Sequence, residues 1–147
     1  MTSRILIATD GSKLSRKAVK HGIALARALG ASVVACHARP PFPTMYYGEP
    51  MAVPESALQE YDADMKRFAA KYLAEVAADA KRAGVDCKGV HQLDTSPADC
   101  IMRTAKREKC DLIVMASHGR KGLARALIGS ETNRVLTLSK VPVLVVR

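Results

Sequence analysis

Five short apolar runs alternate with longer amphipathic segments, and this alternation limits the possible folds more than any other feature of the chain. The runs lie at residues 4–9, 31–38, 86–92, 111–116 and 143–146. Most are uninterrupted and rich in β-branched residues, which is typical of strands buried on both faces of a parallel sheet. Parallel strands need long crossover connections, usually helices. The pattern therefore predicts an α/β fold with a five-stranded parallel sheet and helices on both of its faces.

The segments between the runs carry helix signals. Apolar residues recur at steps of three and four from Ser15 to Leu29, and Gly30 follows where a helix favours a left-handed residue. Ser96 and Pro97 form a cap and a first helical position for a helix that reaches about residue 108.

Two more helices are expected, at residues 130–138 and, much longer, up to Gly84. The long one carries a stripe of large apolar side chains at helical spacing, which we expect to pack in the core. The stripe consists of Leu58, Tyr61, Met65, Phe68, Tyr72 and Val76.

The character of the runs also predicts the strand order. The first and fourth are the most continuously apolar and should be central, whereas the third contains Lys88, His91 and Gln92 and suits an edge. The order 3-2-1-4-5 satisfies both conditions. It opens a switch point at the carboxyl ends of strands 1 and 4, where residues 10–12 should meet residues 116–119.

Residues 39–55 should be a long loop, because they hold five of the seven prolines and neither a helix nor a strand can continue through them. Loops of this length often cover a binding site, but an aromatic-bearing loop can also simply pack on the surface. Both interpretations remain open at this point.

Length and composition predict one domain over residues 1–147. No apolar run approaches the ~20 residues of a membrane span, and nothing resembles an export signal, so we expect a cytoplasmic protein with no membrane partner. Cys36, Cys87, Cys100 and Cys110 are widely spaced and are expected to be thiols without an assigned chemistry.

The basic charge favours anionic partners without identifying them. The net charge is +9, and residues 101–147 hold ten Lys or Arg against three acids, a local excess of +7. This segment contains no aromatic residue on which bases could stack, so nucleic-acid binding is the less favoured interpretation.

The richest candidate site lies between Ala116 and Ser130. Gly119 allows a close approach of the backbone to a ligand, and Gly129 with Ser130 begins a helix, where free N–H groups and the helix dipole favour an anion. Together they would form a phosphate cradle. On physical grounds alone, an equal alternative is that the glycines only turn the chain and Ser130 only caps the helix.

The spacing of these residues resembles the ATP motif of the universal stress protein family, Gly-x-x-Gly-(nine residues)-Gly-(Ser/Thr). Here the motif reads Ala116-Ser117-His118-Gly119, nine residues, then Gly129-Ser130, so alanine replaces the first glycine. Further similarities are Thr9-Asp10-Gly11-Ser12, Cys36-His37-Ala38 and the tail 139–146, so the resemblance spans the chain. It implies a Rossmann-like fold of the adenine nucleotide alpha hydrolase-like type.

The resemblance also implies which residues bind the nucleotide. Those expected on the adenine and ribose side, at the loop entrance and around the phosphates are Ala8, Thr9, Asp10, Ala38, Met115, Ala116, Gly119, Arg120, Gly129, Ser130 and Glu131. ATP, with Mg²⁺ accompanying it, is the expected ligand. The family's usual homodimer would form through the edge strand of Val143, Leu144, Val145 and Val146.

Catalysis is not expected. The chain has no P-loop and no clear general base, and His118 has no neighbour in the sequence that would orient it, so the protein should be at most a very slow ATPase. No protein metal site is expected, because the histidines and cysteines lack ligand spacing. The expected function is a regulatory, stress-response homodimer that binds ATP. The alternative is a nucleotide-independent dimeric interaction or chaperone-like module. The replacement of the first motif glycine by Ala116 is the feature that favours it.

Overall fold

The computed structural model describes residues 1–43, 45–46, 49–50, 52–119 and 128–147. Its main sheet consists of β1 (Arg4–Ala8), β2 (Ser32–Arg39), β5 (Cys87–Leu93), β6 (Leu112–Ala116) and β7 (Val143–Val146). Its helices are α1 (Lys13–Leu29), α2 (Glu55–Arg82), α3 (Pro97–Arg107) and α4 (Ser130–Leu138). The strands β3 (Met45–Tyr46) and β4 (Glu49–Pro50) pair separately and antiparallel.

All neighbouring strands of the main sheet are parallel, in the order β5-β2-β1-β6-β7. Numbered within the sheet, this is the order 3-2-1-4-5, so the expected α/β fold, the central positions of β1 and β6 and the edge position of β5 are confirmed. None of the helices in the described parts of the chain is long and apolar enough to cross a membrane.

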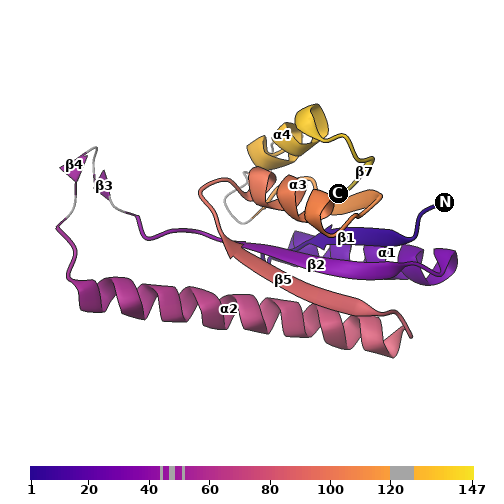
Figure 1. The fold of residues 1–147 in the computed structure, drawn as a ribbon, viewed down its shortest axis with the longest axis horizontal. Helices are drawn as coiled ribbons and strands as arrows, with labels where there is room; N and C mark the ends of the chain where they lie inside the picture. The colour runs from indigo at the N-terminus through magenta and orange to yellow at the C-terminus, as the bar shows by residue number, and fades with distance from the viewer. Residues whose placement is uncertain (44, 47–48, 51, 120–127) are drawn as a thin grey trace.

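The helices form a layer on each face of the sheet (Figure 1). Alternate residues of β1 divide between two cores, because successive side chains of a strand point to opposite faces. Ile5 and Ile7 pack with α1 and α2, whereas Leu6 packs with α3 and with Val135 of α4. All four side chains are fully buried.

The helix ends confirm the signals at Gly30 and Ser96 in the sequence and add a cap at Ser12. The Ser12 hydroxyl accepts a hydrogen bond from the Ser15 N–H at 3.1 Å, and the Ser96 hydroxyl accepts one from the Asp99 N–H at 3.2 Å. Gly30 has a φ of 64° and ends α1 in the left-handed conformation. These local signals fix where α1 and α3 begin, and therefore where the strands before them end.

The apolar stripe of α2 is only partly in the core, so this expectation was wrong for the first half of the helix. Tyr72, Leu73 and Val76 are buried against the sheet, but Leu58 and Phe68 are 38% and 42% exposed. Figure 1 shows the reason, since the first half of α2 extends past the ends of β2 and β5. We call residues 55–68 the α2 arm.

The α2 arm should therefore contribute little to stability. We expect Leu73→Ala to lower the free energy of unfolding by about 2–4 kcal/mol, because it removes a buried side chain that packs on the sheet. Phe68→Ala should cost less than about 1 kcal/mol, because Phe68 is already 42% exposed to water in the folded protein. Urea denaturation of both variants measures the difference, and equal losses would contradict this division of the helix.

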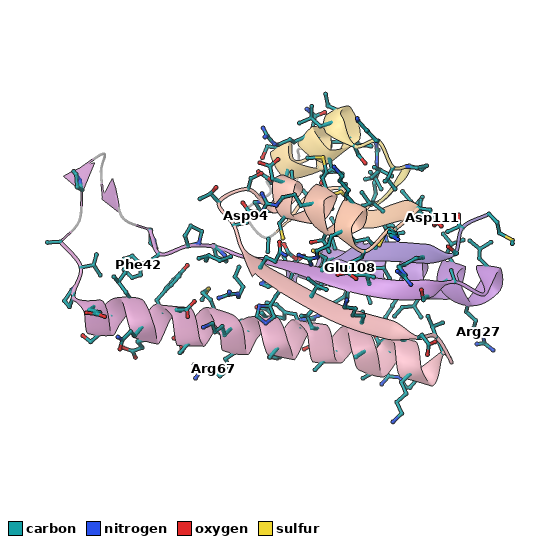
Figure 2. All side chains as sticks on the ribbon, viewed as in Figure 1. Arg27, Phe42, Arg67, Asp94, Glu108 and Asp111 are labelled. Carbon is teal, nitrogen blue, oxygen red and sulfur yellow. The ribbon has the colours of Figure 1, made fainter. Side chains whose placement is uncertain are left out.

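The proline-rich segment 39–55 contains a short β-ladder that the sequence did not reveal. Strands β3 and β4 form a two-stranded antiparallel pair, although Pro50 takes part in it. Before this pair, the chain lies against the α2 arm: Arg39 donates to Asp62 at 2.9 Å, and the rings of Phe42 and Tyr61 meet edge to face at 5.1 Å. Figure 2 shows Phe42 between this segment and α2.

Candidate functional site

The carboxyl ends of β1 and β6 lie side by side, because the two strands are neighbours with Ile7 in register with Val114. The loops that follow them meet, as expected for a switch point. A Cβ placed on Gly119 would lie 2.8 Å from Oδ2 of Asp10, so the backbone of one loop runs against the side chain of the other. Only a residue without a side chain fits there while Asp10 keeps its position.

The turn after β1 is shaped by its own side chains. The Thr9 hydroxyl accepts a hydrogen bond from the Gly11 N–H at 3.3 Å, and Oδ1 of Asp10 accepts one from the Ser12 N–H at 2.9 Å. Gly11 has a φ of 74°, and a Cβ on it would lie 2.2 Å from Cε1 of Tyr72. Glycine is therefore required for two reasons, the left-handed backbone and the buried tyrosine ring beside it.

His37 supports this turn from the neighbouring strand, a role that was not predicted from the sequence. Its ring nitrogen Nδ1 lies 2.8 Å from the Thr9 carbonyl oxygen, and the Thr9 N–H donates to the Cys36 carbonyl at 2.9 Å. The His37 ring also meets the Tyr72 ring edge to face at 5.3 Å. In the sequence, the signal that could have indicated this positioning role was a histidine directly after the apolar residues of the second strand.

The two ends of the loop between β6 and α4 are held together by backbone contacts. The Gly129 N–H donates to the Ser117 carbonyl at 2.7 Å, and the Ser117 N–H donates to the Val146 carbonyl at 2.8 Å. The buried Thr132 hydroxyl donates to the Ala116 carbonyl at 2.9 Å. These bonds place the first turn of α4 directly beside the end of β6. The role of Thr132 was not predictable from the sequence, because the partner of its hydroxyl lies 16 residues away in the chain.

The amino terminus of α4 has the properties of an anion site. Its N-cap is Gly129, which has no side chain to satisfy the first N–H groups of the helix. The Asn133 N–H bonds to the Gly129 carbonyl, so the intrahelical ladder begins there and the preceding N–H groups at the helix start have no intrahelical acceptor. Ser130 is exposed at this end. Uncapped N–H groups and the helix dipole together favour a phosphate.

Ala116, which replaces a motif glycine, does not have a backbone conformation that requires glycine. Lys109 is the one non-glycine residue at positive φ among the described residues, so the φ of Ala116 is negative. The Ala116 side chain is 7% exposed and packs in the core on the α1 side of the sheet. A methyl group at this position is therefore compatible with the path of the chain.

The remaining predicted site residues differ in what they offer. Met115 is buried in the core beneath α3, so only its backbone faces the strand end. Ala8 and Ala38 lie at the carboxyl ends of β1 and β2. Glu131 accepts a hydrogen bond from the Ala98 N–H at 2.7 Å and so connects α4 to the start of α3. Arg120 lies outside the described residues. The nucleotide-binding roles of all these residues stay predictions.

His118 is engaged with its neighbour. Its Nδ1 lies 3.1 Å from the hydroxyl of Ser117, the residue whose carbonyl joins the two ends of the loop between β6 and α4. In the parts of the chain that the structure describes, no group of three or more His, Cys, Asp or Glu side chains could hold a metal ion. The site as described therefore offers N–H donors and small residues, an arrangement suited to holding an anionic ligand.

Comparison with known proteins gives one consistent result. The sequence model of the Universal stress protein family matches residues 1–147. A universal stress protein of Thermus aquaticus is 36% identical over 147 residues, covering 100% of both chains. Protein MJ0577 of Methanocaldococcus jannaschii superimposes with a TM-score of 0.84 at 27% identity, covering 99% of this chain and 96% of that one. A universal stress protein solved in complex with cAMP superimposes with a TM-score of 0.72 at 26% identity, covering 99% and 97%.

Proposed function

Because this chain belongs to the universal stress protein family, we propose that it binds ATP or a related adenine nucleotide at the switch point between β1 and β6. The observation that carries the proposal is the uncapped amino terminus of α4, which is fixed beside the two strand ends. A relative of the same fold was solved with cAMP, which contains the same adenine, ribose and phosphate groups.

Each part of the site has a distinct task in this proposal. The N–H groups at the start of α4 and the backbone of Gly119 hold the phosphates, with Mg²⁺ accompanying them. Asp10 faces the ribose, and the backbone at Ala38 faces the adenine. His37 and Thr132 act as positioning residues, because they hold the carbonyls of Thr9 and Ala116 rather than the ligand.

The nucleotide acts as a regulatory ligand in this proposal, not as a substrate. The site consists of N–H donors and small side chains, and the His118 ring is turned to Ser117. Binding without turnover fits a cytoplasmic stress-response protein whose bound and empty states differ in stability or in the partners they bind.

Release of ligand from the purified protein tests the proposal directly. We expect denaturation to release an adenine nucleotide, and we expect added ATP to raise the melting temperature, because a ligand that binds only the folded state stabilises it. GTP at the same concentration is the matched control. No adenine nucleotide and no shift with ATP would favour a nucleotide-independent interaction module instead.

The methyl group of Ala116 should be neutral for nucleotide binding. We expect Ala116→Gly to change the dissociation constant for ATP by less than about twofold, equivalent to about 0.4 kcal/mol. The same change should lower the free energy of unfolding by about 1 kcal/mol, because it frees the strand backbone and removes a buried methyl. Titration calorimetry and urea denaturation measure the two effects. A clear gain in affinity would show that the methyl crowds the nucleotide.

We further propose that the protein is a homodimer joined through β7, the edge strand of the sheet. Leu144 is 40% exposed there, and Val143 and Val145 are partly exposed. An edge strand with apolar residues can pair with a second copy of itself.

A proline in this strand should separate the subunits without unfolding them. The backbone N–H groups of Ile113 and Ser117 donate hydrogen bonds to the carbonyls of Pro142 and Val146. The backbone groups of successive strand residues point to opposite sides, so the N–H of Val145 points away from β6, to the open edge of the sheet. Val145→Pro removes that donor and keeps the pairing with β6. We expect a monomer by light scattering. If the Val145→Pro variant remains a dimer, the interface lies elsewhere in the molecule.

A further inference from the structure

Two of the four cysteines form a pair that their spacing in the sequence did not reveal. Cys36, in β2, and Cys100, in the first turn of α3, are separated by 64 residues, but their sulfur atoms lie 4.0 Å apart. Both are fully buried between the sheet and α3. Cys110 is buried beyond the opposite end of α3, and Cys87 begins β5. All four are free thiols.

The surroundings of the pair favour one reactive sulfur. A hydrogen bond from the Cys36 thiol lowers the pKa of Cys100, and the same bond, together with burial, holds the pKa of Cys36 well above its usual value. Cys100 also lies at the amino end of a helix, a position that favours a thiolate. The buried Thr104 hydroxyl lies near both sulfurs and has no hydrogen-bond partner among the described residues.

The other two cysteines lack such surroundings. Burial raises the pKa of Cys110 to about 11 and raises the pKa of Cys87. Thiolates, not thiols, are the nucleophiles in thiol chemistry. Within one molecule, these two residues therefore serve as internal controls for any reaction at the Cys36–Cys100 pair.

We propose that Cys36 and Cys100 are a hydroperoxide-sensitive dithiol that converts reversibly into a disulfide between β2 and α3. The Cys100 thiolate attacks one oxygen of hydrogen peroxide, the O–O bond breaks, and Cys100 sulfenic acid and hydroxide form. Hydroxide takes the Cys36 proton as water, and the Cys36 sulfur then attacks the sulfenic sulfur and displaces the second hydroxyl, which leaves as water once protonated from solvent. In total, two thiols and one peroxide give one disulfide and two waters.

The separation of the sulfur atoms sets the movement that this step requires. A disulfide has a sulfur separation of about 2.05 Å, so the two atoms, now 4.0 Å apart, must approach by about 2 Å. The carbonyl of Cys36 accepts the hydrogen bond from Thr9 at the end of β1. The bond would therefore tie α3 to the strand that supports the switch-point turn. Figure 2 shows Asp94 where the chain leaves β5 towards α3.

Peptide mapping of the whole protein tests the proposal. The reduced protein is treated under native conditions with equimolar hydrogen peroxide, denatured in the presence of an alkylating agent, and digested without reduction. We expect a cross-linked peptide that joins Cys36 to Cys100, a mass loss of two hydrogen atoms, and alkylated Cys87 and Cys110. Dithiothreitol should restore four alkylatable thiols.

Variants separate the two steps. Cys36→Ser keeps a hydroxyl that can donate a hydrogen bond to Cys100 but cannot form a disulfide, so the reaction should stop at Cys100 sulfenic acid, which dimedone traps. The control Cys110→Ala should form the cross-link as the unmodified protein does. The proposal is overturned if the unmodified protein gives no peptide that joins Cys36 to Cys100, or if the cross-links join all four cysteines at random. The mapping of the unmodified protein decides the question even if a variant does not fold.

Discussion

Gly11→Ala is expected to be among the most damaging single substitutions in this protein, lowering the free energy of unfolding by about 2–5 kcal/mol. A left-handed backbone costs an L-residue about 1–2 kcal/mol, and Gly11 has a φ of 74°. The added methyl would also lie 2.2 Å from a ring carbon of Tyr72, which is buried and held against His37, so the ring must move at a cost of about 1–3 kcal/mol.

Gly30→Ala is the matched control for this prediction. Gly30 has a similar φ of 64°, but a methyl group there meets nothing within 4 Å. We therefore expect a loss of only about 1–2 kcal/mol, from the backbone alone. Urea denaturation measures both variants. Equal losses would mean that Tyr72 moves aside without cost and that the contact with Gly11 does not stabilise the turn.

Gly129→Val should weaken nucleotide binding at least about tenfold, or about 1.4 kcal/mol. A Cβ on Gly129 would lie 3.0 Å from Cβ and 3.1 Å from Cα of His118, so the new side chain presses on backbone that cannot rotate away. It would move the first turn of α4 away from the end of β6, and the N–H groups proposed to hold the phosphates would move with it. Titration calorimetry with ATP measures the loss.

Gly89→Val separates loss of binding from loss of stability. A Cβ on Gly89 would also be tight, at 3.3 Å from Cβ of Leu73, but Gly89 lies on the edge strand β5, two positions from β1 and three from β6 in the sheet. We expect Gly89→Val to lower stability and to leave the dissociation constant for ATP unchanged. If Gly129→Val binds ATP as well as Gly89→Val does, the phosphates are held elsewhere.

Local signals made most of the fold predictable. Gly30 and Ser96 act on their immediate neighbours, and the structure confirms both caps. The strand order followed from the difference between continuously apolar runs and the polar run in β5, which is a property of burial on one or both faces. Signals of this kind need no knowledge of distant parts of the chain.

Features that depend on distant residues were not predictable in the same way. The periodicity of α2 identifies its apolar face, but whether a sheet lies beneath Phe68 depends on where β2 and β5 end. The contacts of His37 with Thr9 and of Thr132 with Ala116 cross between elements, as does the approach of Cys36 to Cys100. In the candidate site, Gly119 and Gly129 could be identified from the sequence. The structure added His37 and Thr132, which hold the backbone at the ends of β1 and β6.

The α2 arm has a consequence for how this chain can change over generations. A protein tolerates substitutions until its stability falls below a threshold, and residues 55–68 contribute little to the core that sets that threshold. New side chains there would alter the surface while leaving the sheet and its switch point intact. Selection for new binding partners could therefore act on this projecting half-helix independently of selection for the fold.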